Sequence, residues 1–141
     1  MDNNFKSLFE LTDEQSVNNF EQRMEIILPL EYRKFLLKYN VSMPSLRCFK
    51  TERNIIESIE VFFGLTSKKH LDLIQNRVRG IVNDIPRVFL VIGEDGGGNK
   101  ICIKLTDPEN GSIWFFDHEE VGDKRASKIS NSFTGFINML H

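Results

Sequence analysis

The sequence contains little of several residue types on which particular classes of protein depend. It holds only two cysteines, Cys48 and Cys102, among 141 residues. Two cysteines without a Cys-x-x-Cys spacing are too few for a structural zinc site or a disulfide framework. Each lies in an apolar stretch, where a free cysteine behaves as a small buried side chain. We therefore expect both to be reduced, as is usual in a cytoplasmic protein.

The sequence also lacks a large excess of acidic or basic residues, and it lacks long apolar stretches. The formal net charge is −2 at pH 7, so the field of the whole molecule is too weak to recruit nucleic acid or an anionic membrane. No apolar run approaches the length needed to span a bilayer. The N-terminus, Met1-Asp-Asn-Asn-Phe-Lys6, lacks the basic and apolar regions of a signal peptide. The composition predicts a soluble cytoplasmic protein with no direct nucleic-acid or membrane partner.

The motifs of common catalytic and phosphate-binding sites are likewise missing. There is no Gly-x-Ser-x-Gly elbow and no His-Glu-x-x-His helix. The segment Ile92-Gly-Glu-Asp-Gly-Gly-Gly-Asn-Lys-Ile-Cys-Ile103 is rich in glycine, but its acidic residues would repel phosphate and its last isoleucines recur at strand spacing. We therefore predict a hairpin turn in which Gly96, Gly97 and Gly98 adopt positive φ. We predict no catalytic residue, no metal and no cofactor.

What is present is the pattern of an α+β protein, with 40% hydrophobic residues. Thr12 and Gln15 have the form of a capping box before a helical pattern that reaches Ile27. Three further stretches have apolar residues at helical spacing: Pro29–Asn40, Lys68–Asn83 and Ser130–Leu140. The strand-like runs are Ser45–Phe49, Ile59–Phe63, Val88–Ile92, Ile101–Leu105 and Ser112–Phe116. Residues 1–141 are thus predicted to form a single domain, whose mostly antiparallel sheet is covered by N-terminal, central and C-terminal helices.

The densest group of reactive side chains is Asp117-His118-Glu119-Glu120. Residues 91–123 hold eight acidic side chains against two lysines, a local balance of −6, whereas residues 64–90 carry +3. An acidic surface of this kind can steer a basic partner. Because alternate residues of a strand share a face, a metal site completed by Glu94 or Asp95 is a second interpretation. The interpretation that we favour is a solvated strand end.

Several segments, in order along the chain, together resemble the SUKH superfamily. That superfamily includes bacterial toxin-immunity proteins and fungal regulators of cell-wall glucan synthesis. The segments are Leu28-Pro-Leu-Glu-Tyr-Arg-Lys-Phe-Leu-Leu-Lys-Tyr-Asn40, Ser58-Ile-Glu-Val-Phe-Phe-Gly64, Ile92–Ile103, Gly111-Ser-Ile-Trp-Phe-Phe-Asp-His-Glu119 and Ser132-Phe133. The chain departs from the family after Asn40, where Val41-Ser-Met-Pro44 replaces the frequent Asn-Gly-Gly, and at Phe116, where many relatives have tryptophan. Structural roles are assigned to the landmark residues Pro29, Tyr32, Phe35, Gly96, Gly98 and Phe133.

The resemblance implies an α+β scaffold that binds proteins and is not an enzyme. Its implied partner in bacteria is a cognate toxin, often a nuclease, which the immunity protein neutralises by direct binding. An adaptor that regulates cell-wall or glucan synthesis is the alternative, and a small metal-dependent hydrolase using Asp117, His118 and Glu119 is a distant one. Trp114 is either an aromatic anchor for the partner or a core residue. The candidate contact residues are Glu94, Asp95, Trp114, Asp117, His118, Glu119 and Glu120.

Overall fold

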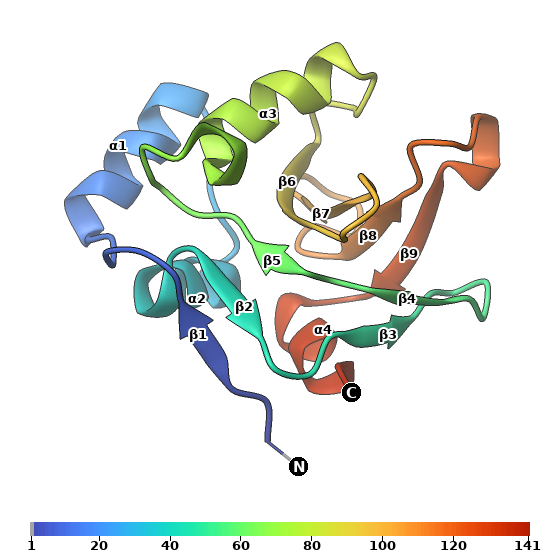
Figure 1. Cartoon of the computed structure of the whole chain (residues 1–141). Coiled ribbons are helices and arrows are strands. Elements are labelled where there is room, and N and C mark those ends of the chain that lie inside the picture. Colours follow the sequence, from blue (N-terminus) through green and yellow to red (C-terminus); the bar gives the residue numbers. More distant parts are fainter. Residues whose placement is uncertain (1) are drawn as a thin grey trace.

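The computed structural model describes residues 2–141, which fold into four α-helices and a seven-stranded antiparallel sheet (Figure 1). The helices are α1 Glu14–Met24, α2 Leu30–Tyr39, α3 Leu73–Val82 and α4 Phe133–Met139. In spatial order the strands are β1 Phe5–Ser7, β2 Ser42–Pro44, β5 Val61–Phe62, β6 Phe89–Glu94, β7 Lys100–Lys104, β8 Ile113–Phe116 and β9 Ala126–Ser130. β3 (Cys48–Lys50) and β4 (Ile56–Ser58) form a separate hairpin. This arrangement confirms the predicted α+β class.

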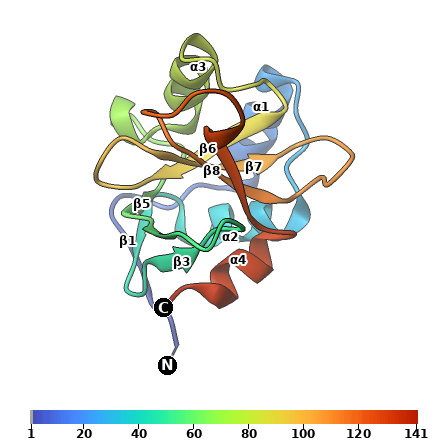
Figure 2. The same cartoon turned by 90° about the vertical axis from the view of Figure 1, so that its right-hand side faces the viewer.

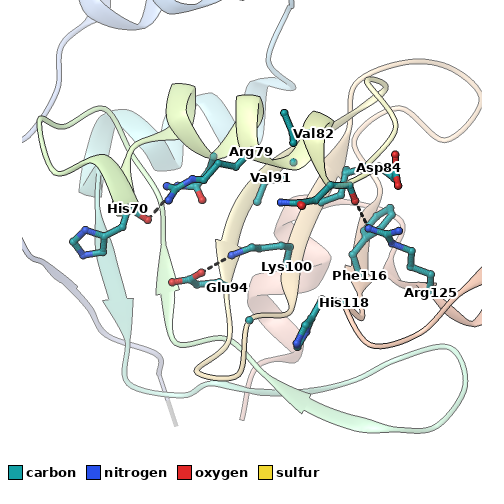
Figure 3. A pocket seen from close by; sticks show the side chains of 15 residues that line it. His70, Arg79, Val82, Asp84, Val91, Glu94, Lys100, Phe116, His118 and Arg125 are labelled. Atoms are coloured by element: carbon teal, nitrogen blue, oxygen red, sulfur yellow. Dashed lines mark hydrogen bonds and ion pairs between the residues drawn. The ribbon is translucent and has the colours of Figure 1, made fainter.

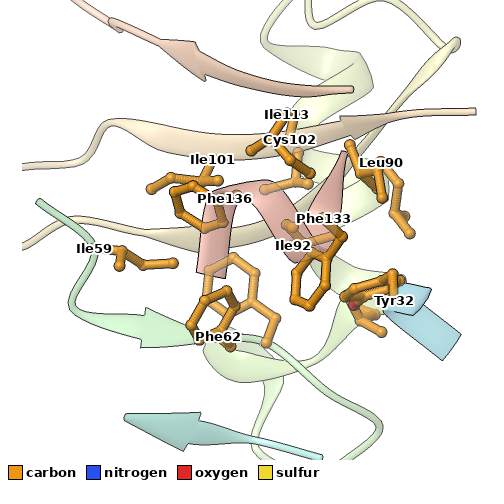
Figure 4. Packing of buried hydrophobic residues seen from close by; sticks show 14 of the residues in the cluster. Tyr32, Ile59, Phe62, Leu90, Ile92, Ile101, Cys102, Ile113, Phe133 and Phe136 are labelled. Carbon is orange, nitrogen blue, oxygen red and sulfur yellow. The ribbon is translucent and has the colours of Figure 1, made fainter. Parts of the chain in front are cut away.

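The central strands of the sheet are covered on both faces. Figure 2 shows α3 on one side of β6, β7 and β8, and α2 and α4 on the other. On the α2 and α4 side, Phe62 lies 6.2 Å from both Phe133 and Phe136, measured between ring centroids, and Tyr32 lies 5.2 Å from Phe133 (Figure 4). These rings are buried together with the isoleucines of β6 and β7. Most of the phenylalanines of the chain thus belong to the buried core.

Three of the four helices begin where a short polar side chain caps them, whereas α2 follows Pro29 and has no side-chain cap. Asp13, and not Thr12 as predicted, caps α1 by accepting a hydrogen bond from the Ser16 amide at 2.8 Å. Asp72 caps α3, so the helix begins later than the predicted Lys68, after a 3₁₀ turn at Lys69–Leu71 (η1). Ser132 caps α4. Ser130, predicted to begin that helix, belongs to β9.

The strand predictions were accurate for the centre of the sheet and poor for its edges. β6, β7 and β8 lie where the sequence predicted strands, and the glycine-rich segment is the turn between β6 and β7. Of its three glycines only Gly98 has positive φ, at +95°. The runs Ser45–Phe49 and Ile59–Phe63 contribute the shorter strands β3 and β5. No strand was predicted at β1, β2, β4 or β9.

Asn40 fastens the end of α2 to two other segments. Its backbone has φ 56° and ψ −121°, a conformation that costs a non-glycine residue of the order of 1–3 kcal/mol. Its buried side-chain amide donates to the carbonyls of Glu10 and Leu65 at 2.8 and 2.9 Å, and its Oδ1 accepts from the Leu65 amide at 2.8 Å. Asn40 therefore does more than mark the end of the helical stretch predicted over Pro29–Asn40.

Both cysteines are free, Cys102 being buried in β7 and Cys48 half-buried in β3. Burial raises the pKa of the Cys102 thiol well above its ordinary value. A buried thiol of this kind is chemically inert. Within residues 2–141, no helix combines the length and apolar character needed to cross a membrane.

Candidate functional site

The sheet brings most of the predicted contact residues to one of its ends. Glu94 at the end of β6 pairs with Lys100 at the start of β7, and Lys100 pairs with Phe116 at the end of β8. The turn after β6 and the loop after β8 must therefore lie side by side, because paired positions in antiparallel strands are neighbours. We name this region the acidic end and define it as residues 94–100 and 117–125.

A direct contact joins the two segments of the acidic end. The Asn99 side-chain oxygen accepts a hydrogen bond from the His118 backbone amide at 3.0 Å and lies 2.7 Å from His118 Nδ1. The imidazole also lies over Gly98, where an added Cβ would come within 3.3 Å of it. His118 thus has a structural contact, although its ring remains exposed.

Two of the predicted contact residues already have partners within the chain. The Asp95 carboxylate accepts hydrogen bonds from the Gly97 and Asn99 backbone amides at 2.8 and 2.9 Å, and from the Asn99 side chain at 2.8 Å. Asp95 therefore shapes the turn, as an aspartate commonly does. Glu94 forms an ion pair with Lys100 at 2.6 Å, so its charge is largely neutralised.

In the loop after β8, two of the acidic side chains are more exposed than those of Glu94 and Asp95. Asp117 accepts a hydrogen bond from the Glu119 amide at 3.0 Å, which folds the chain into a short turn. Glu119 is 82% exposed and lies 3.8 Å from the imidazole of His118. Glu120 is exposed as well.

Trp114 does not join this group. It is half-buried, its indole ring packs edge-on against Phe89 at 5.7 Å between centroids, and its Nε1 donates to Ser112 Oγ at 2.8 Å. Phe89 also packs against Phe116 at 5.0 Å between centroids, so the indole belongs to a cluster of three aromatic rings. This packing favours the core interpretation of the tryptophan over the anchor interpretation.

A groove of about 560 Å³ opens between α3 and the acidic end (Figure 3). We name it the α3 groove. Three basic side chains line it, Arg79, Lys100 and Arg125, against the carboxylates of Glu94 and Asp84. His70 and His118 lie on opposite sides of it. Its lining is therefore not acidic, even though two predicted contact residues belong to it.

Arg125 ties the acidic end to α3. Its guanidinium donates a hydrogen bond to the backbone carbonyl of Asn83, just after the helix. Its Nε is buried and has no hydrogen-bond partner among residues 2–141. Residues 64–90, which carry a net charge of +3, thus contact the acidic end here, and the α3 groove lies between the two.

A second hollow, of about 320 Å³, lies on the other side of the same loop. We name it the hairpin cleft, because one wall is the β3–β4 hairpin and the other is the loop of residues 117–125. Its acidic lining residues are Glu57, Asp117 and Glu120. Burial raises the pKa of Glu57, and the nearby carboxylates of Asp95 and Asp117 raise it further. Arg53 and Lys124 line the cleft as well, so its acidic side chains outnumber its basic ones by three to two.

Sequence reasoning missed Glu57 as a member of the site. It lies 60 positions before Asp117 along the chain, on a strand that was not predicted. The available signal was the polar turn Thr51-Glu-Arg-Asn54 between two strand-prone runs, where Asn54 adopts a φ of 63°. Recognising that hairpin would not by itself have placed it beside β8.

Among the residues described, no group of three or more histidine, cysteine, aspartate or glutamate side chains is placed to hold a metal ion. His118 and Glu119 approach each other to 3.8 Å, while the Asp117 carboxylate accepts a hydrogen bond from the Glu119 backbone amide. The residues described thus provide the hydrolase interpretation with no set of three ligands.

Comparison with known proteins matches nearly the whole chain to one family. The model of the SMI1 / KNR4 family (SUKH-1) matches residues 11–139. The structure is similar to the crystal structure of a protein from Pseudomonas syringae pv. tomato, with a TM-score of 0.56 and 21% identity over 82% of this chain and 76% of that one. At this identity the likeness supports the fold alone. No curated protein matches the chain.

Proposed function

Since the chain belongs to the SMI1 / KNR4 family (SUKH-1), we propose that residues 1–141 form one protein-binding domain that acts as an immunity protein. In this proposal the domain has no catalytic role. It resides in the cytoplasm and neutralises a cognate toxin by binding to it directly. Membership of the family is the first support for this function, and the acidic end is the surface that we propose to bind the toxin.

The observation that carries the proposal is the arrangement of charge around the loop of residues 117–125. The α3 groove on one side has an excess of cationic side chains, and the hairpin cleft on the other has an excess of carboxylates. A surface with two adjacent regions of opposite charge rejects partners that lack the complementary pattern. Such selectivity is what an inhibitor of one toxin requires.

A nuclease is a suitable class of toxin for this surface. Nucleases bind phosphate groups with lysine and arginine, so their active-site faces are basic. The exposed side chains of Glu119 and Glu120 would attract such a face over a distance and speed the encounter. An inhibitor that occupies the phosphate-binding surface would block the enzyme without chemistry of its own.

The first test is capture of the partner from the native host with this chain as bait, followed by mass spectrometry. We expect recovery of a toxin whose killing is relieved when the chain is co-expressed. Recovery of wall-synthesis enzymes, with no toxin and no protection, would support the alternative role as an adaptor in cell-wall or glucan synthesis.

Charge reversal then tests the surface. The double variant Glu119→Lys with Glu120→Lys should lower protection and slow association, with a larger effect at low salt. The matched control is Glu10→Lys with Glu25→Lys, which changes the net charge equally on exposed side chains outside the acidic end. Equal loss in both variants would show that net charge matters and the acidic end does not.

A further inference from the structure

The hairpin cleft is held open by its own framework. Arg53, at the tip of the β3–β4 hairpin, donates hydrogen bonds to the backbone carbonyls of Asp123 and Ala126 across the cleft. On the sheet side, the Glu52 amide donates to the Lys128 carbonyl at 2.8 Å. The two walls are therefore fastened to each other at a fixed separation. The guanidinium of Arg53 is already engaged with these backbone carbonyls.

Acceptors without partners line the space between the walls. The carboxylates of Glu57 and Glu120 form no hydrogen bond or ion pair with any residue from 2 to 141. Thr51 also lines the cleft and is only 4% exposed. Its backbone amide and carbonyl are both used in the hairpin turn, by Ile55 and Asn54. Its Oγ1 is buried with no partner.

The charges in the cleft do not balance. Glu57, Asp117 and Glu120 face Arg53 and the exposed Lys124, and Asp95 adds a fourth carboxylate near Glu57. Mutual repulsion among these carboxylates is the cost that a guest cation would remove. The remaining lining includes Ile55 and Phe115, which can cover the apolar stem of a long side chain.

We propose that the hairpin cleft receives one arginine side chain from the partner protein, an inference that rests on the proposed protein-binding function and names the group recognised. Arginine suits it better than lysine, because its planar guanidinium carries five N–H donors and can serve two carboxylates and a hydroxyl at once. The stem would lie along Ile55 and Phe115. Glu57 is the residue that orients the guest from the hairpin side.

The direct test needs no knowledge of the partner. The ¹⁵N-labelled chain is titrated with Nα-acetyl-arginine amide and its amide resonances are followed by NMR. We expect saturable shifts at Thr51, Glu57, Asp117 and Glu120. The neutral isostere Nα-acetyl-citrulline amide should leave these resonances in place. Shifts spread evenly over all surface carboxylates, or equal shifts with citrulline, would overturn the proposal.

Lysine distinguishes arginine recognition from simple attraction of a cation. Nα-acetyl-lysine amide carries the same charge on a comparable stem. The proposal predicts weaker binding by lysine, because the ammonium group lacks the planar fork. Binding of lysine as tight as that of arginine would overturn the choice of guest.

Substitutions of opposite sign sharpen the test. Glu57→Gln should weaken arginine binding about fivefold, since it removes one charged acceptor. Lys124→Gln should strengthen binding, because it removes a competing cation from the lining. Glu52→Gln is the matched control, since Glu52 is an exposed residue of the same hairpin that does not line the cleft. Equal weakening by Glu52→Gln would overturn the assignment.

The cleft and the proposed function can fail separately. If a toxin is captured and neutralised but Glu57→Gln leaves its affinity unchanged, the immunity function stands and the arginine cleft is wrong. If the amide probe binds at the cleft and the chain protects against no toxin, the cleft stands and the immunity function is wrong.

Discussion

Replacement of Asn40 provides the sharpest test of how the fold is held together. Its side chain makes three hydrogen bonds at 2.8–2.9 Å to the backbone of Glu10 and Leu65, and the residue is 1% exposed. At about 1 kcal/mol for each buried bond, Asn40→Ala should lower the free energy of unfolding by about 3 kcal/mol. Asn40→Gly loses the same bonds but relieves the unfavourable backbone conformation, so its loss should be about 1 kcal/mol smaller.

Asn40→Asp should be the least stable of the three at neutral pH. It replaces the amide donor with a buried carboxylate oxygen that faces two carbonyls, and that carboxylate has no cationic partner. The pKa of the new carboxyl would be raised, so this variant should regain stability as the pH falls and the group becomes protonated.

Urea unfolding followed by the fluorescence of Trp114, the one tryptophan, measures all three variants. The control is Asn131→Ala, at an exposed position that should change stability by less than about 0.5 kcal/mol. An Asn40→Ala variant as stable as this control would refute the reasoning. So would a glycine variant that is less stable than the alanine variant.

Three other substitutions test separate parts of the structure by the same unfolding measurement. Gly93→Ala should cost about 1–3 kcal/mol, because its Cβ would lie 2.7 Å from the carbonyl oxygen of Val61 in the adjacent strand, whereas Gly96→Ala, with open space around it, should be nearly neutral. Tyr32→Phe should cost nothing or stabilise the protein, because the buried hydroxyl has no partner among residues 2–141; a clear loss would indicate an unrecognised hydrogen bond. The pKa of Glu57 is raised above the ordinary value of 4.5, so the folded state binds its proton more tightly and this residue lowers stability as the pH rises above that value. Glu57→Gln should therefore be at least as stable as the parent at pH 7. A less stable variant would contradict the raised pKa of Glu57.

The sequence was sufficient to predict the helices and the central strands because their signals are local. The helical spacing of Phe133 and Phe136 in α4 and the continuous apolar runs of β6 and β8 reflect burial that each segment requires by itself. β9 has no such signal. Its sequence, Ala-Ser-Lys-Ile-Ser, is a strand because β8 offers it hydrogen-bonding partners, which is a property of the tertiary structure.

The candidate site was predictable to a similar degree. The acidic turn after β8 was visible as a cluster, and the meander of β6, β7 and β8 was enough to place Glu94 beside it. The opposite charges of the α3 groove and the hairpin cleft were not predictable, because they depend on contacts such as that of Arg125 with Asn83, 42 positions apart. The packing of Trp114 was equally undetermined, because core aromatics and interface aromatics have the same sequence pattern.

Three side chains that hold the loops of the acidic end in place bear on how this surface could change in evolution. Asp95, Arg53 and Arg125 each bond to backbone amides or carbonyls. A backbone group is the same whichever side chain its residue carries, so Asp123 or Gly97 can be replaced without removing the bond that positions the loop. The exposed residues of these loops are therefore free to vary while the hydrogen bonds that position the loops are retained. A protein that must follow a rapidly diversifying adversary would benefit from such a separation between support and recognition.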